Sequence, residues 1–159
     1  SSLAHLQSRE DFDTISQFLS KGFSEPMQYF YLTGGEYGDY TDFAEVKEGV
    51  VKICGLVERQ VYLAGFKIEE DSFAELITAC ANVKSVCFED CQISISQEFI
   101  LPSKVKFDIK SLDLYKTARL TNDDFINEDK MRVLIEAISK SSLKESLRFL
   151  HVKDSQART

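Results

Sequence analysis

The sequence predicts an α/β fold in which short parallel strands alternate with helices. Segment 56–93 holds two short alternating apolar pieces, at 61–63 and 86–88, with a helical pattern between them. Apolar residues in that pattern recur at i, i+3, i+4 and i+7, which marks one face of a helix: Phe73, Leu76, Ile77 and Cys80. Two parallel strands require a connection of this length, and the unit recurs along the chain.

Composition narrows the class of protein. At 159 residues the chain is one domain, or one piece of a larger array, and is long enough to bury most of its apolar surface. The net charge of -7 argues against broad nucleic-acid or anionic-membrane binding, because both need a field that attracts phosphate. No apolar run approaches the roughly 20 residues of a membrane helix, and no signal-like start is visible.

The four cysteines lie inside apolar patterns and lack the paired CxxC spacing of a zinc site: Cys54, Cys80, Cys87 and Cys91. The sequence therefore predicts reduced, buried thiols and no metal. Reduced thiols are typical of intracellular proteins, so we expect a cytoplasmic or nuclear location.

The first half of the chain divides at Pro26. Residues 1–26 are expected to form an N-terminal helix or cap, because Phe12, Ile15, Phe18 and Leu19 have helical spacing. A strand at 29–32 then runs into the glycine-rich segment 34–38, GGEYG, which is neither a GxGxxG nor a Walker loop and predicts a turn. A helical stripe at 43–51 follows.

In the second half, segment 94–107 is expected to be irregular, because Pro102 forbids a long helix. A strand lies near 109–116, and the polar segment near 118–130 is interpreted as an insertion. The next helical stripe and the last strand follow, the stripe formed by Met131, Leu134, Ile135 and Ile138.

Five short strands share an apolar pair that flanks one variable residue, at 30–32, 61–63, 86–88, 112–114 and 150–152. Their first residues are 31, 25, 26 and 38 positions apart. Three of these steps lie close to a period of about 20 to 29 residues, and the fourth contains the polar insertion.

The match extends beyond the apolar pairs. Segment 83–93, VKSVCFEDCQI, resembles L-x-x-L-x-L-x-x-N/C-x-L at every fixed position, and segments 109–117 and 147–155 carry Thr117 and Ser155 at the polar position. A small hydrogen-bonding side chain there can satisfy backbone groups where the chain leaves the strand. The chain thus resembles a leucine-rich repeat protein with long, ribonuclease-inhibitor-like, degenerate repeats.

This resemblance implies a short curved solenoid over 27–159, with about five parallel strands backed by helices on the convex side. In such an arc the intervening strand residues face the concave surface. The resemblance also implies a non-catalytic protein-protein interaction module that binds a protein or peptide and needs no cofactor.

The concave surface would change in character from one end to the other. Tyrosines come first and supply large contact area with a polar tip, and the carboxylates that follow would select basic groups. Tyrosine is also common at solvent-facing strand positions for its β-propensity alone. The candidate binding residues are Tyr29, Tyr31, Tyr62, Glu89, Asp90, Asp113, Tyr115 and His151.

Other interpretations remain open. A doubly wound α/β domain would show the same alternation, but its strands would be near-continuous apolar runs rather than segments interrupted by Ser85 or Asp113. The chain could instead be a structural subunit or C-terminal fragment of a larger assembly, with self-association through the uncapped edge beyond 150–152. A nucleic-acid-associated adaptor would use the basic run from Lys104 to Lys116, although the charge of the chain makes nucleic acid an unfavourable partner.

No enzyme is predicted. The chain lacks a G-x-S-x-G elbow, and no nucleophile, base and orienting group can be nominated from spacing. The acidic segment 123–129 lacks the alternating ligands and central glycine of a calcium loop.

Overall fold

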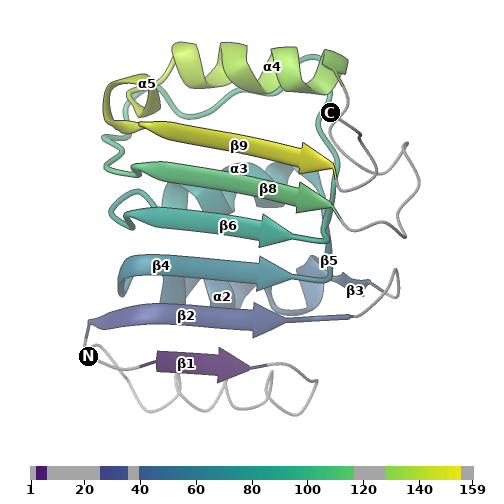
Figure 1. Ribbon diagram of the computed structural model, residues 1–159, viewed down its shortest axis with the longest axis vertical. Coiled ribbons are helices and arrows are strands. Elements are labelled where there is room, and N and C mark those ends of the chain that lie inside the picture. The colour runs from purple at the N-terminus through teal and green to yellow at the C-terminus, as the bar shows by residue number, and fades with distance from the viewer. Residues whose placement is uncertain (1–2, 7–25, 36–39, 117–127, 155–159) are drawn as a thin grey trace.

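The computed structural model of the chain describes residues 3–6, 26–35, 40–116 and 128–154. Within them lies a six-stranded sheet in the order β1-β2-β4-β6-β8-β9, in which every pair of neighbours is parallel (Figure 1). The order of the strands in space is therefore their order along the chain. Their bounds are β1 Leu3–Leu6, β2 Met27–Thr33, β4 Val57–Ala64, β6 Ser85–Glu89, β8 Ser111–Lys116 and β9 Phe149–Asp154.

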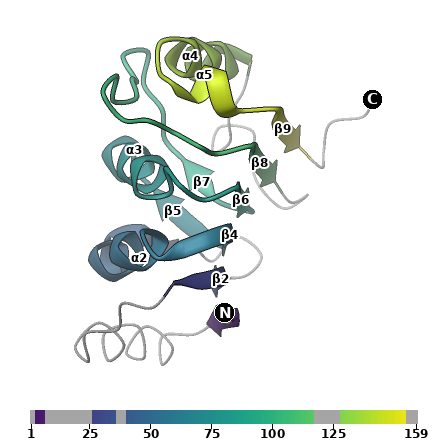
Figure 2. The ribbon, with the colours of Figure 1, turned by 90° about the vertical axis from the view of Figure 1, so that its left-hand side faces the viewer.

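Helices follow β2, β4 and β8 along the chain and lie on one side of the sheet. Figure 2 shows α2, α3, α4 and α5 together on that side, with none of the described helices on the other. The expected α/β fold with a parallel sheet and helices is thus confirmed. The helical bounds are η1 Phe43–Glu45, α2 Lys47–Cys54, α3 Glu70–Ala79, α4 Glu128–Ser139 and α5 Leu143–Ser146.

The five expected strands align in register. Phe30 on β2 pairs with Val61 on β4, Val61 with Val86 on β6, and the line continues through Leu112 to Leu150. The apolar pairs of β2, β4, β6 and β8 are at most 1% exposed and form the core with the apolar faces of the helices. The residue between each pair points to the opposite face, because side chains alternate along a strand.

A second, small parallel sheet was not predicted. It consists of β3 Thr41–Asp42, β5 Phe66–Ile68 and β7 Gln92–Ile93, in that order. Gly65 makes the turn from β4 into β5 with φ +75, and a Cβ there would lie 2.1 Å from the Gly35 carbonyl oxygen. Only glycine accepts both the left-handed backbone and the close approach.

The cysteines are buried and free, as predicted. Cys91, at the expected polar position, lies with its Sγ 3.6 Å from the carbonyl oxygen of Leu63 and 3.5 Å from that of Glu89. Its thiol therefore donates to backbone acceptors at the end of neighbouring strands, which is the role expected for this position.

Several details differ from the sequence interpretation. Strand β1 was not predicted, nor was α5. Segment 94–107 is irregular, as expected, and is held by buried Phe99 and Phe107, while the strand expected near 109–116 begins at Ser111. The expected insertion near 118–130 ends earlier, because α4 begins at Glu128. The expected helix over 12–19 and the rest of that insertion lie outside the described residues.

Candidate functional site

Three tyrosines form a cluster on the sheet face that the described helices leave uncovered. The rings of Tyr29 and Tyr31 on β2 have centroids 6.2 Å apart, and Tyr31 meets Tyr62 on β4 edge to face at 5.5 Å. The Tyr31 hydroxyl donates to Gln60 Oε1 at 2.9 Å. All three side chains are half-buried, so the cluster presents a pre-packed aromatic surface.

Glu89 joins this cluster to the middle of the sheet. The Tyr62 hydroxyl donates to Glu89 Oε1 on β6 at 2.7 Å. Burial, followed by this hydrogen bond and the charge of Glu89, raises the pKa of Tyr62 above its usual value. Tyr62 therefore stays protonated and orients the carboxylate beside the aromatic cluster.

Asp113 and His151 form the next group along the same face. Nδ1 of His151 on β9 lies 3.1 Å from Oδ1 of Asp113 on β8, and Ser111 Oγ donates to Asp113 Oδ2 at 3.4 Å. The Asp113 side chain is only 17% exposed, and its Oδ1 accepts no hydrogen bond from the described residues. The two side chains lie within ion-pair distance across neighbouring strands.

Cys87 stands in the same row as Tyr62 and Asp113, and it is buried. Burial, reinforced by the charges of Asp113 and Glu89, raises the pKa of the Cys87 thiol to about 12. A thiol held protonated in this way is neither a nucleophile nor a ready metal ligand. The described part of the chain holds no group of three or more His, Cys, Asp or Glu side chains placed to bind a metal ion.

Seven of the eight candidate residues share the open face, and Asp90 does not lie free on it. Asp90 is 8% exposed, adopts φ 52 and accepts a hydrogen bond from the Tyr40 hydroxyl at 2.9 Å. It therefore stabilises the turn after β6. Tyr115 pairs in register with Glu89, and burial raises its pKa above the usual value.

A wide depression opens at the amino ends of β2, β4 and β6, and the sequence did not indicate it. Its volume is about 1080 Å³. The register shifts here, because Met27 pairs with Val57 but Tyr29 pairs with Gln60, which leaves one extra residue in β4. Polar groups line the depression: Gln28, Glu58, Arg59, Gln60, Asn82, Lys84 and Ser85.

The chain matches no protein-family model, no curated protein and no solved structure. Its candidate site is accordingly defined by geometry alone. None of the helices in the described ranges is both long and apolar enough to cross a membrane.

In the basic run from Lys104 to Lys116, one aromatic residue is buried and one lysine is ion-paired. Phe107, which lies between Lys106 and Lys110, is 3% exposed and belongs to the core. Lys110 is paired with Asp108, Nζ to Oδ1 at 3.0 Å. Base stacking needs accessible rings, so Phe107 does not supply it.

Proposed function

We propose that the chain is a degenerate leucine-rich repeat arc that binds a protein or peptide on its open sheet face, without catalysis. The aligned apolar pairs, the helices on one side and the hydrogen-bonding role of Cys91 support the repeat assignment. An intracellular setting agrees with the buried, free cysteines.

The tyrosine cluster and its carboxylate neighbour carry this proposal. Edge-to-face packing of Tyr31 on Tyr62, and the hydrogen bond from Tyr62 to Glu89, fix these side chains before any partner arrives. Pre-ordered aromatic groups lose little conformational entropy on binding. Beside them, Glu89 and Asp113 offer negative charge, so the face suits a partner that brings a lysine or arginine against an aromatic surface.

The test selects ligands from random sequences and so requires no natural partner to begin with. A random peptide library displayed on phage is panned against the chain, and selected peptides are measured by isothermal titration calorimetry. We expect enrichment of basic and aromatic residues. Tyr31→Ala should weaken a selected peptide about tenfold or more, because truncation of an aromatic anchor removes central contact area.

Two matched variants separate binding from folding. Tyr31→Phe keeps the ring and should retain most of the affinity, while Glu48→Ala on the exposed side of α2 should leave the affinity unchanged. Circular dichroism verifies that each variant is folded. Selected basic and aromatic peptides that bind Tyr31→Ala as tightly as the wild type, or a selection that enriches no basic and aromatic peptides, would refute the proposal.

A second candidate function is self-association through β9. Phe149 is 57% exposed, and Leu150 and Val152 are only partly buried. Within the described residues β9 is the last strand of the sheet, so its outer backbone groups are available for pairing. Sedimentation velocity should show a concentration-dependent dimer that Phe149→Glu abolishes; a wild-type monomer at every concentration would reject this candidate.

A further inference from the structure

Four basic residues form a row along the amino edge of the sheet. Each of them immediately precedes one of four residues that pair with one another across β4, β6, β8 and β9. These paired residues are Gln60, Ser85, Ser111 and Phe149. The backbone confirms the alignment, since Lys110 N donates to Lys84 O and Arg148 N donates to Lys110 O, both at 2.8 Å. The row consists of Arg59, Lys84, Lys110 and Arg148.

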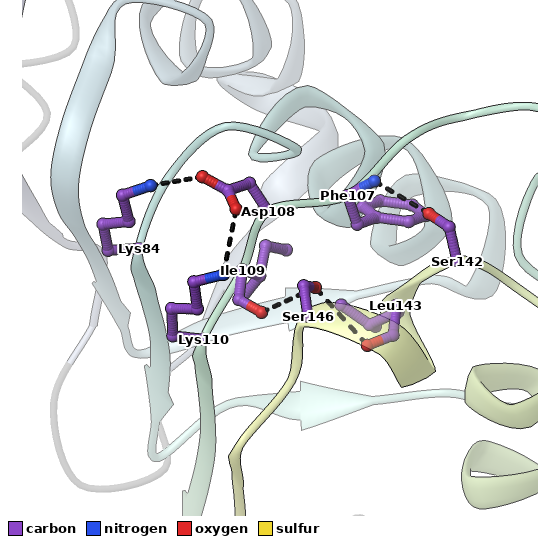
Figure 3. Close-up of polar contacts among 8 residues, drawn as sticks. All are labelled: Lys84, Phe107, Asp108, Ile109, Lys110, Ser142, Leu143 and Ser146. Atoms are coloured by element: carbon purple, nitrogen blue, oxygen red, sulfur yellow. Dashed lines mark hydrogen bonds and ion pairs between the residues drawn. The ribbon is translucent and has the colours of Figure 1, made fainter.

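The row spans roughly 14 Å, because neighbouring strands lie about 4.8 Å apart. Figure 3 shows Asp108 between two of its members, Lys84 and Lys110, with an ion pair to each. These two lysines share one carboxylate and keep an excess positive charge. The pairing holds the pKa of Asp108 down at about 2, so that carboxylate stays charged throughout the neutral range.

The ends of the row are less neutralised. Arg59 is exposed and uses its Nε to bond Gln28 Oε1 at 2.8 Å, while the amide of Gln28 donates to Glu58 at 2.6 Å. Arg148 is exposed and has no side-chain partner among the described residues. The polar depression adjoins the row at Arg59 and Lys84 and adds amide and hydroxyl donors from Asn82 and Ser85.

We propose that the basic row and the adjoining depression bind an acidic segment of a partner protein. Closely spaced cations with free donors match carboxylate side chains on an extended peptide. This site adjoins the tyrosine cluster, because Tyr29 also lines the depression, but it carries the opposite preference in charge.

Nucleic acid fits the same surface less well. The net charge of the chain is -7, and the open face beyond the row carries Glu89 and Asp113. A long polyanion would extend past four cations into this negative field, whereas a short acidic segment ends within the row.

The test uses fluorescence polarisation of a fluorescein-labelled hexaglutamate peptide with the purified chain at low salt. Arg59→Gln combined with Arg148→Gln should weaken binding about tenfold, and added salt should weaken binding to the wild type. The matched control combines Lys67→Gln on β5 with Arg132→Gln on α4, which removes the same net charge from exposed positions elsewhere. We expect affinity within about twofold of the wild type for this control.

Specific outcomes would overturn the proposal. These are no binding of hexaglutamate, an equal loss in both double variants, or tighter binding of a labelled hexauridylate than of hexaglutamate. Tyr62→Ala changes the tyrosine cluster at a side chain that does not line the depression, and it should leave hexaglutamate binding unchanged. Loss of hexaglutamate binding in Tyr62→Ala would contradict the assignment to the amino edge.

Discussion

Strands β6 and β9 carry the same sequence pattern but lie in different surroundings. In β6 the apolar pair, Val86 and Phe88, is at most 1% exposed, and the strand is paired on both sides. In β9 Leu150 and Val152 are only partly buried, and pairing within the described residues is to β8 alone. The apolar pair therefore determines which side chains point towards the core. How deeply they are buried, and so how much they stabilise the fold, depends on whether a further strand and helix pack beside them.

Phe88→Ala tests the burial of β6 and should have the largest effect on stability. Phe88 is 1% exposed and its ring packs against Phe73 with centroids 5.3 Å apart. Loss of a buried aromatic ring leaves a cavity and should lower the free energy of unfolding by about 3 to 5 kcal/mol. Urea denaturation followed by circular dichroism measures the change.

Phe149→Ala on β9 serves as the control because it removes the same ring from an exposed position on the open face. This side chain is 57% exposed, so the variant should shift the free energy of unfolding by no more than about 0.5 kcal/mol. Similar losses for the two variants would contradict the exposed position of Phe149.

Gly65→Ala extends the comparison to the turn that links the two sheets. An alanine here would have to adopt a left-handed backbone, and its Cβ would collide with the Gly35 backbone. We therefore expect the free energy of unfolding to fall by about 2 kcal/mol or more, as measured by thermal or urea denaturation. The control is Gly55→Ala, where φ is -66 and the nearest atom, Lys52 O, is 3.4 Å away. This control should be neutral or slightly stabilising; equal destabilisation would contradict the role of the turn.

Ser146→Ala probes how the last unit is held despite its weaker burial. The buried Ser146 hydroxyl donates to the Ile109 carbonyl oxygen at 2.9 Å, which ties α5 to the segment before β8 (Figure 3). Removing this donor should cost about 1 to 2 kcal/mol in unfolding free energy. Ser139→Ala removes an exposed hydroxyl-to-carbonyl bond within α4 and should cost less. A larger loss for Ser139→Ala than for Ser146→Ala would contradict the role of the Ser146 hydrogen bond in holding α5.

Asp108→Asn should give the smallest effect, and one that depends on pH. The lysines flanking Asp108 lower its pKa from 3.8 to about 2 in the folded chain. The charged carboxylate therefore stabilises the fold above pH 3.8, and this contribution is lost as pH falls towards about 2. Urea midpoints of wild type and variant should differ slightly at neutral pH and converge at about pH 2; a constant difference would contradict this account.

The main sheet could be predicted because each unit repeats one local rule. An apolar pair with one residue between them places both side chains on the core side, and Cys91 marks where the chain turns. Strand β1, LAHL, has only four residues and shows no such repeat, so its strand character depends on pairing with β2. Strands β3 and β7 have two residues each, too few for any periodicity to be visible.

The positions of side chains on the open face could be predicted wherever they follow from the strand register. Side-by-side placement of Tyr31 and Tyr62, and of Asp113 and His151, follows once the apolar pairs are aligned. The turn conformation of Asp90 and the extra residue in β4 at the depression do not follow, because both depend on local departures from the repeat.

The sheet order β1-β2-β4-β6-β8-β9 also has a kinetic consequence. Because spatial order equals chain order, no strand must wait for a distant end of the chain before it can pair. Folding can start at a well-buried central unit and spread to either side, and unfolding should begin at the terminal strands. Pulling the two ends apart with optical tweezers should peel strands away in sequence from the ends.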